Sequence, residues 1–348
     1  MPRFTVEHKS TSENIKLGGV YWKRLLIDAQ IDMYLQGAAS IDFKCDGVLY
    51  DVLYKIGLRP KLATPIEKRK YVEKTGKLYA RQRETDEDPE EFEKRCLDKI
   101  KEDPERYYQR ATIVRLEGEK LEAQLDVWQT AASIRDAKRL NVFPRNSDSC
   151  VQWGRACEFF EVCTNTRDID DPVFFKVQQF EHSELGERGE GLLTQSSIRC
   201  YRSCPRRYFY RYVKRVRSLS DEAAPLRVGT LIHLALEVWW KTGGNLPLAL
   251  GALDASKDPY ERAKMRAMII CYHARWEKPP PTEWVELFIR MPLINPETGA
   301  MSRTFELGMK LDVLCELDEA LTMPAGDPQD LTATLEASLQ ELEVAEAD

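Results

Sequence analysis

The chain has 348 residues, of which 43% are hydrophobic and 31% are charged, and its formal net charge is −6 at pH 7. This length suits one large or two ordinary domains, and the composition is typical of a soluble globular protein. No apolar run approaches the ~20 residues that a membrane-spanning helix needs, and the first residues lack the apolar core of a signal peptide. We therefore expect no membrane partner and a cytoplasmic location.

Charge is distributed unevenly along the chain. Residues 191–220 contain eight Lys or Arg and no Asp or Glu, whereas residues 316–348 contain ten acids and no base. One basic segment in an acidic protein indicates a local site for a polyanion rather than attraction by the whole surface. The acidic segment would repel nucleic acid, so we expect it to lie clear of such a partner.

The first part of the chain begins with a predicted strand over residues 3–9, where apolar and polar residues alternate. Residues 21–35 carry apolar side chains at helical spacing, and Gly37 is expected to end that helix. Residues 43–56 are typical of a strand, with a turn marked by Gly47.

Residues 64–140 are rich in Glu, Lys and Arg and predict three or four surface helices. Pro89 and Pro104 are each followed by glutamate, which is favourable in the first turn of a helix. The last of these helices should span about 118–139, and the polar, glycine-bearing end of residues 164–191 behaves as a linker.

The second part of the chain opens on Thr194, which offers a cap for a helix that leads into the basic segment. A further helix opens at Val228, and residues 259–276 predict another. Residues 284–291 and 303–315 alternate as two strands on either side of a turn.

Glu7 and Lys9 share one face of the first predicted strand, because side chains two residues apart point the same way. A carboxylate and an ammonium in this arrangement can share one metal ion and one attacking water. The alternative is a solvated edge strand in which both side chains face water. A motif this short does not decide between the two.

Nine cysteines in a protein expected in the cytoplasm argue against a disulfide framework. Four of them stand singly among apolar or helical residues and are expected to be buried thiols. These are Cys45, Cys96, Cys271 and Cys315. The other five fall in two tight groups and need a reason, unless they too are free or buried thiols. They are Cys150, Cys157 and Cys163 in a loop-like stretch, and Cys200 and Cys204 on the helix after Thr194.

The basic segment interleaves arginines with aromatic rings. Its centre consists of Arg206, Arg207, Tyr208, Tyr210 and Arg211. Cations that bind phosphates and rings that stack on unpaired bases are the features of a single-strand channel. The alternative is a helix whose rings pack inward and whose arginines are solvated, and both can hold at once.

Five segments form a pattern when the chain is taken in rotated order, from residue 192 to 318 and then from 3 to 163. They are the cysteine–proline helix over 196–210, the motif Gly229–His233, the strand over 308–312, the triplet Glu7-His8-Lys9, and Gln30 with Tyr34 on the helix that follows it. This pattern resembles the PD-(D/E)XK nuclease superfamily, in particular the RecB-like exonucleases that carry an iron–sulfur cluster and their phage relatives. The resemblance implies an α/β fold with a central mixed β-sheet flanked by helices, here with an added helical region.

The resemblance also implies a metal site. Asp312, Glu7 and the main-chain carbonyl of His8 would hold Mg²⁺ or Mn²⁺ through oxygen ligands. His233 would add an imidazole, which tilts the preference toward Mn²⁺. Each residue also has a plainer interpretation, such as a packed core histidine at position 233.

The reaction that the resemblance implies is hydrolysis of a phosphodiester without a covalent intermediate. Lys9 would orient or deprotonate the attacking water and offset charge in the transition state. Gln30 and Tyr34 would contact the phosphate backbone or steady the site, although they could merely share one helix face.

The same family places a thiolate at the position of Cys204, which would join Cys150, Cys157 and Cys163 as ligands of a [4Fe–4S] cluster. By ligand softness alone, four thiolates suit Zn²⁺ as well. Cys200 is a rival to Cys204, and Cys150 stands further from Cys157 than the family spacing. Such a cluster would act as a staple and needs no redox role.

The order of the motifs departs from the family, in which the aspartate strand precedes the E-x-K strand. A circular permutation would produce this order, with the new ends cut into the connection between those strands and the old ends joined through about residues 164–191. Halves exchanged between two copies would give the same order, and so would a chain rejoined at gene level that never folds. The expected divisions are residues 1–63 and 192–318 as the two halves of the nuclease core, 64–149 as a helical region, 150–191 as the cysteine-bearing loop and linker, and 319–348 as an acidic tail.

We therefore expect a metal-dependent deoxyribonuclease that acts as an exonuclease on DNA ends or single strands. Its setting would be recombination, replication or repair in a bacterial or phage-infected cell. The alternative is a non-catalytic DNA-binding or scaffold protein that keeps the fold and the cluster. A second copy of the chain is the other partner that the sequence leaves open.

Overall fold

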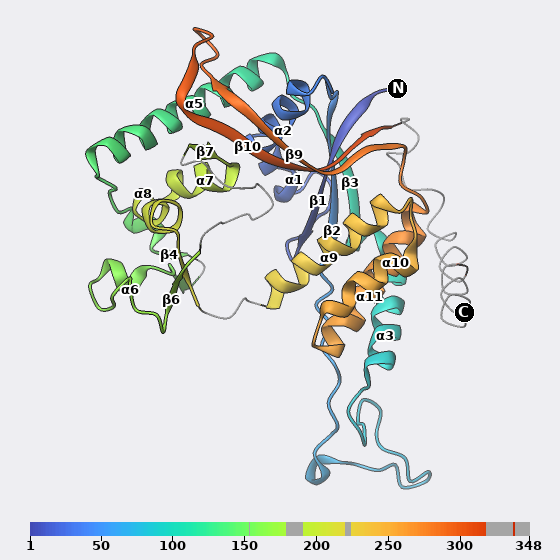
Figure 1. Cartoon of the computed structure of the whole chain (residues 1–348). Coiled ribbons are helices and arrows are strands. Elements are labelled where there is room, and N and C mark those ends of the chain that lie inside the picture. The colour runs from blue at the N-terminus through green and yellow to red at the C-terminus, as the bar shows by residue number, and fades with distance from the viewer. Residues whose placement is uncertain (153, 179–190, 220–223, 318–336, 338–348) are drawn as a thin grey trace.

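A six-stranded mixed sheet forms the centre of the computed structural model, which describes residues 1–152, 154–178, 191–219, 224–317 and 337. The strands follow the order β3-β2-β1-β10-β7, and β9 pairs with the other side of β10. Their bounds are β1 Arg3–Thr11, β2 Gly47–Tyr54, β3 Tyr108–Ile113, β7 Leu192–Leu193, β9 Thr282–Ile294 and β10 Met301–Glu316. Helices flank this sheet (Figure 1), so the predicted fold class is confirmed.

The first and last strands of the described chain lie side by side at the centre of the sheet. β1 pairs antiparallel with β10, from Arg3 opposite Glu316 to Val6 opposite Val313. On its other side β1 pairs parallel with β2, up to Thr11 opposite Tyr54. Residues 3–6 and 313–316 therefore pair within one chain.

Two apolar cores lie on the two faces of the sheet, because alternate residues of β2 point to opposite sides. Leu49 and Leu53 join the core beneath one group of helices, and Val48, Tyr50 and Val52 join the other. The first group is α3 Pro89–Glu102, α9 Ala224–Lys241, α10 Leu246–Gly251 and α11 Pro259–Trp276. The second is α1 Val20–Leu25, α2 Ala29–Ser40, α5 Glu117–Leu140 and α7 Gln195–Ser203.

The helix predicted over 21–35 is two helices, and Gly37 does not end it. The Asp28 side chain accepts a hydrogen bond from the Gln30 backbone amide and so starts α2 as a new helix. Gly37 lies inside α2 because Met309 of β10 packs against it. A Cβ at Gly37 would stand 2.1 Å from the Met309 sulfur. Close approach of helix to sheet, and not a turn, explains this glycine.

The prediction for residues 64–140 is partly correct. Helices begin at Pro89 and at Pro104, as predicted, and the last predicted helix is α5. However, α3 buries one face, residues 108–113 form the edge strand β3, and residues 57–88 form an arm with one short 3₁₀ turn, η1 Ile66–Lys68. Charge-rich composition masked the apolar positions at helical spacing that anchor α3.

The predicted elements of the second part of the chain are largely confirmed. Thr194 caps α7, and α11 spans the predicted residues. The two predicted strands are β9 and β10, each longer than expected, while α9 begins at Ala224, ahead of Val228. The four singly placed cysteines are buried, as predicted.

The cysteine-bearing residues 144–178 and 204–219 form a small lobe beside the sheet domain (Figure 1). Its short elements are η2 Ser147–Ser149, β4 Val151–Gln152, β5 Arg155–Ala156, α6 Phe160–Cys163, β6 Phe175–Val177, α8 Pro205–Tyr208, η4 Phe209–Val213 and β8 Val216–Ser218. Among the described residues of the lobe, five buried apolar side chains form its own core: Phe159, Val162, Phe175, Tyr210 and Val216. A core this small gives little stability by itself.

The remaining elements are the short helices α4 Pro104–Tyr107 and η5 Ala252–Ala255. None of the helices in the described part of the chain has both the length and the apolar character needed to cross a membrane. The predicted acidic tail, apart from residue 337, and most of the predicted linker lie outside the described residues.

Candidate functional site

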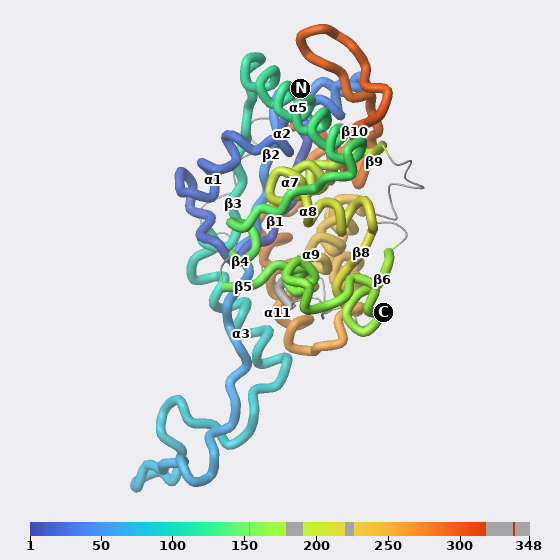
Figure 2. Tube along the Cα trace, turned by 90° about the vertical axis from the view of Figure 1, so that its left-hand side faces the viewer, coloured from blue at the N-terminus to red at the C-terminus, as the bar shows by residue number. Residues whose placement is uncertain are grey.

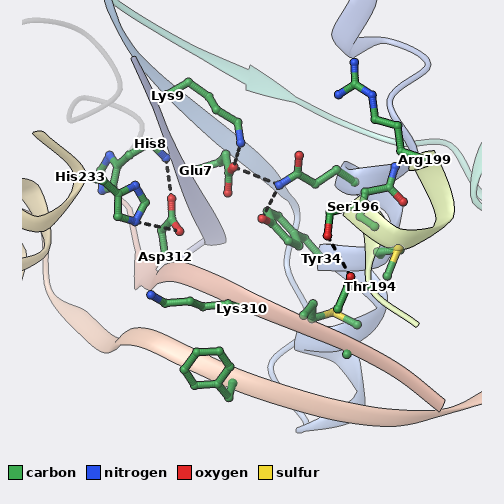
Figure 3. A pocket seen from close by; sticks show the side chains of 16 residues that line it. Glu7, His8, Lys9, Tyr34, Thr194, Ser196, Arg199, His233, Lys310 and Asp312 are labelled. Atoms are coloured by element: carbon green, nitrogen blue, oxygen red, sulfur yellow. Dashed lines mark hydrogen bonds and ion pairs between the residues drawn. The ribbon is translucent and has the colours of Figure 1, made fainter. Parts of the chain in front are cut away.

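A cavity of about 400 Å³ opens where β1, β10, α2, α7 and α9 meet. Seven residues predicted from the sequence line it: Glu7, His8, Lys9, Gln30, Tyr34, His233 and Asp312. Figure 3 shows their side chains converging from strands and helices that are far apart in the chain. The structure thus brings together every predicted catalytic and metal-binding residue.

Glu7 is a buried acid of the cavity with two side-chain partners. Its side chain is 3% exposed, and its Oε1 atom pairs with the Lys9 ammonium and accepts a hydrogen bond of 3.1 Å from the Gln30 amide. The same Gln30 amide contacts the Tyr34 hydroxyl. Glu7 Oε2 is buried and has no hydrogen-bond partner. Burial of a carboxylate oxygen without a hydrogen-bond partner costs free energy unless a bound cation interacts with it.

Asp312 lies on β10 beside the strand that carries Glu7. Its Oδ2 atom accepts a hydrogen bond of 2.9 Å from the His8 backbone amide. Burial raises the pKa of Asp312, and so does the nearby charge of Glu7, while His233, His8 and Lys9 act against this rise. A divalent cation bound between two buried acids would reduce the repulsion between their charges.

The charge of Lys9 is set by its acidic neighbours. Burial alone would lower the pKa of Lys9, but the carboxylates of Glu7 and Asp312 outweigh it and the pKa is raised. These two acids therefore favour the ammonium form of Lys9. Burial and the same two acids raise the pKa of Tyr34 well above its usual value, so that phenol stays protonated.

Glu286 is an acid of this site that the sequence analysis missed. His233 Nε2 lies 3.0 Å from Glu286 Oε1 and 3.5 Å from Asp312 Oδ1. Ligand atoms of these three side chains lie within 4.8 Å of one another, the one such group of His, Cys, Asp or Glu among the described residues. The other oxygen of Glu286 pairs with Lys310 of β10.

The backbone of Glu286 explains its position. Its φ angle is +60°, which is uncommon and strained for a residue other than glycine. It stands on β9 between Val285, which pairs with Val313, and Leu287, which pairs with Leu311. The signal in the sequence was a single acid within an apolar stretch opposite the strand of Asp312.

A buried ion network supports the strand that carries the site. His8 Nδ1 lies 3.5 Å from Asp51 Oδ2, and Arg110 binds the same oxygen at 2.9 Å. Burial would raise the pKa of Asp51, but Arg110 and His8 outweigh it, and the pKa lies well below its usual range. This network holds His8, and with it the backbone between Glu7 and Lys9.

Arg199 is the arginine of the basic segment that lines the cavity. It projects from α7, is exposed, and also lines the adjoining hollow together with Lys9 and Gln30. Ser196 of the same helix and Thr194, which caps it, contribute to the cavity wall (Figure 3). A cation at the meeting point of two hollows can hold an anionic chain that runs from one to the other.

The comparison with protein families now bears on this geometry. Residues 192–291 match the PD-(D/E)XK nuclease superfamily. The matched segment includes Arg199, Cys204, His233 and Glu286, and it ends before Asp312. A search of curated proteins and a search of solved structures each found no match.

The match indicates a nuclease, because members of the PD-(D/E)XK superfamily are mostly metal-dependent nucleases that use Mg²⁺ or Mn²⁺. Carboxylates and an imidazole are suitable ligands for these ions. The partnerless Glu7 oxygen and the His233–Glu286–Asp312 group show that the residues present fit such an ion. Glu7 and Lys9 precede the matched segment, so a linear comparison that starts at residue 192 does not reach them.

The predicted cysteine ligands converge on one place in the lobe. Burial raises the pKa of the Cys163 thiol, and so do the neighbouring thiols of Cys157, Cys204 and Cys150. Cys200 packs instead against the core under the sheet. Cys200 and Cys204 lie in different surroundings because α7 ends at Ser203 and Cys204 takes an extended conformation before Pro205.

The predicted stacking role of Tyr208 and Tyr210 is wrong. Tyr208 is 3% exposed and Tyr210 is 8% exposed, because their rings pack into the two neighbouring cores. Arg206 donates to the Phe143 carbonyl, and Arg207 and Arg211 lie near Glu158. The inward-packing alternative holds for these rings, and contact of the three arginines with nucleic acid stays a prediction.

Proposed function

We propose that this protein is a divalent-metal-dependent deoxyribonuclease that hydrolyses phosphodiester bonds at the cavity between β1 and β10. The observation that carries the proposal is the meeting of Glu7 and Asp312 on adjacent strands, with the Lys9 ammonium paired to Glu7 in the same cavity. Two acids on neighbouring strands can bind a cation, and the nearby lysine can contact an attacking water and a scissile phosphate.

Asp312, Glu7 and the main-chain carbonyl of His8 would hold the cation, with His233 and Glu286 as further ligands. When bound, Mg²⁺ or Mn²⁺ supplies Lewis acidity and counter-charge for attack on the phosphate. An imidazole in the ligand set favours Mn²⁺ over Mg²⁺.

The surrounding residues position the substrate and the attacking water. Lys9 would orient or deprotonate the attacking water and offset charge on the phosphate. Gln30 and Tyr34 keep the Glu7 carboxylate in place through their shared contact. Arg199 offers a contact for a phosphate next to the cut, since it lines both hollows.

We further propose exonucleolytic cutting of DNA ends or single strands, in recombination, replication or repair in a bacterial or phage-infected cell. The resemblance of the motifs to RecB-like nucleases supports this, and so does the placement of Cys204 with three further thiols. Membrane binding forms no part of the proposal.

We propose that Cys150, Cys157, Cys163 and Cys204 hold a [4Fe–4S] cluster. The resemblance to RecB-like nucleases supports the cluster, whereas by ligand softness alone four thiolates suit Zn²⁺ as well. Bound there, the group would tie residues 150–163 to the start of α8 within the lobe and compensate for its small apolar core.

The test is cleavage of end-labelled single-stranded and double-stranded DNA, with RNA of the same sequence alongside, in Mg²⁺, Mn²⁺ or EDTA. We expect cleavage of DNA with either ion and none in EDTA. Glu7→Gln and Asp312→Asn should each lower the rate by about 100-fold or more, while Glu306→Gln, an exposed acid of the same strand as Asp312, should leave it unchanged. DNA binding without cleavage under every condition would instead support the non-catalytic scaffold.

A further inference from the structure

A long arm leaves the body of the protein between β2 and α3. Residues 57–88 run outward from the sheet, turn back, and return to the start of α3 (Figures 1 and 2). Both views show the arm well away from the sheet and its helices. An extended segment of this kind adds little to the core, so core packing does not explain it.

The outer part of the arm is basic in a protein that is acidic as a whole. Residues 61–83 contain eight Lys or Arg and two Glu, a formal charge of +6, whereas the whole chain carries −6. The arm as a whole, residues 57–88, has nine bases and six acids and carries +3, because four of its acids lie in residues 84–88 at its base. The side chains of Lys68, Lys70, Lys74, Lys77 and Arg81 are exposed. Within the described residues, no ion pair joins any of these five to an acid. Concentrated, uncompensated positive charge is the signature of a surface that binds a polyanion.

Backbone hydrogen bonds hold the two legs of the arm together. The Thr64 amide donates to the Arg83 carbonyl, the Tyr79 amide to the Lys70 carbonyl, and the Val72 amide to the Lys77 carbonyl, at 2.9, 2.9 and 2.8 Å. Gly76 adopts a φ of +63° at the tip and allows the chain to reverse. The charges are therefore displayed on a paired ribbon and not on a loose tail.

The base of the arm is fixed to the body. Glu87 is 2% exposed and binds Arg95 of α3 with both carboxylate oxygens at 2.7 Å. The Tyr260 hydroxyl of α11 donates to the Glu87 carbonyl at 2.7 Å. A rigid base means that the direction of the arm relative to the cavity is set by the fold.

The arm starts from the end of the sheet at which the cavity lies. β2 ends beside Thr11 of β1, two residues beyond Lys9, and the Lys55 amide donates to the Thr11 carbonyl at 2.7 Å. Each leg has about a dozen residues, so the ribbon reaches at most ~40 Å from its base. This reach corresponds to ~12 base pairs of duplex at 3.4 Å each.

We propose that residues 61–83 bind the phosphate backbone of the nucleic acid on one side of the cut, up to about one helical turn from the cavity. The proposal rests on the proposed nuclease function and adds a second anchoring point for the same substrate. Two features match a nucleic acid: lysines along the ribbon for phosphates, and the half-exposed rings of Tyr71 and Tyr79 among them. An arm of this kind would raise affinity for long substrates without entering the chemistry.

The test compares two variants that remove the same charge. In the arm variant Lys68, Lys70, Lys74 and Lys77 are changed to alanine. In the control variant four exposed lysines outside the arm are changed: Lys44, Lys94, Lys257 and Lys278. Binding of labelled DNA is measured by fluorescence anisotropy in EDTA at several salt concentrations, with single-stranded and double-stranded probes of ~40 and ~10 nucleotides.

We expect the arm variant to bind the long probe at least about tenfold more weakly. The slope of log K against log salt, which is negative, should become shallower by about 0.9 for each lost lysine that contacts duplex. The control variant should stay within about twofold. On the short probe the two variants should bind alike, because a probe held at the cavity does not reach the arm. Whichever long probe shows the larger loss identifies the strand form that the arm binds.

Equal binding of the long probe by the arm and control variants would overturn the proposal. So would an arm variant that keeps its DNA affinity but changes oligomeric state in size-exclusion chromatography, since the arm would then be a contact between copies of the chain. Cleavage assays separate this outcome from failure of the proposed function. If the unmodified protein cleaves DNA and the arm variant binds normally, only the arm proposal fails.

Discussion

The His8 backbone amide donates a hydrogen bond of 2.9 Å to Oδ2 of Asp312, although 304 positions separate the two residues in the chain. This contact ties the strand of Glu7 and Lys9 to the strand of Asp312. The site therefore depends on pairing between β1 and β10, the first and last strands of the described chain.

The first prediction concerns the metal affinity of Asp312→Asn. The asparagine carbonyl can still accept the His8 hydrogen bond, so the strands should stay paired while a charged ligand is lost. We expect Mn²⁺ binding, measured by calorimetry on the full chain, to weaken at least about tenfold. Glu306→Gln is the control, and Mn²⁺ affinity that is equal in both variants would contradict a metal site at Asp312.

Lys9→Gln should separate catalysis from metal binding. The ammonium offsets the charge of Glu7 and Asp312, so its removal should leave Mn²⁺ affinity unchanged or higher. Cleavage should fall by about 100-fold or more, because a cation next to the phosphate is lost. Lys16→Gln, an exposed lysine beyond the end of β1, is the control. Normal cleavage by Lys9→Gln would remove Lys9 from the mechanism.

Glu286 and Lys310 form a pair whose two halves should have opposite effects. Glu286→Gln removes a charged neighbour of His233 and should weaken Mn²⁺ binding by about 10- to 100-fold. Lys310→Gln frees the other Glu286 oxygen and should strengthen it. Calorimetric titration of both variants checks this, and a Glu286→Gln variant with unchanged affinity would leave Glu286 a structural residue of β9.

Cys204→Ser and Cys200→Ser should differ in iron content. Cys204 lies with Cys157 and Cys163, whereas Cys200 packs toward the sheet domain. After anaerobic purification we expect the unmodified protein and Cys200→Ser to contain iron and sulfide and to be brown, and Cys204→Ser to lose both. Zinc without iron in all three proteins would contradict the cluster and support the zinc alternative.

Glu87→Gln should reduce stability in a pH-dependent way. Arg95 lowers the pKa of Glu87 to about 2, below the ~4.3 of an unfolded glutamate. A lowered pKa in the folded state gives stability that is fully present above the unfolded pKa and is lost as pH falls toward the folded one. The difference in free energy of unfolding between Glu87→Gln and the unmodified protein should be constant above about pH 5 and shrink below about pH 4.

Denaturant unfolding at several pH values measures this difference. The control is Glu84→Gln, an exposed acid on the same arm, which should follow the unmodified protein throughout. A difference that persists unchanged down to about pH 3 would show that the Glu87–Arg95 pair does not fix the base of the arm.

Residue spacing predicted most of the elements that carry the site. Alternation identified β1, β9 and β10, and Thr194 and Pro259 marked the starts of α7 and α11, because caps and apolar periodicity are local properties. The helix around Gly37 was misread, because that glycine is required by contact with Met309 on a distant strand. β3 and the arm were missed because charge-rich composition does not reveal the pairing of distant segments.

The amino-acid sequence by itself determined which side chains could do the chemistry: Glu7, Lys9, Asp312, His233 and the cysteines stand in recognisable local patterns. Tertiary structure alone decided that the two ends share one cavity, that Glu286 joins them, that Tyr208 and Tyr210 face inward, and that the arm stands free of the body. The physical reason is that strand pairing and burial depend on residues hundreds of positions apart, whereas periodicity, capping and charge are written into neighbouring residues.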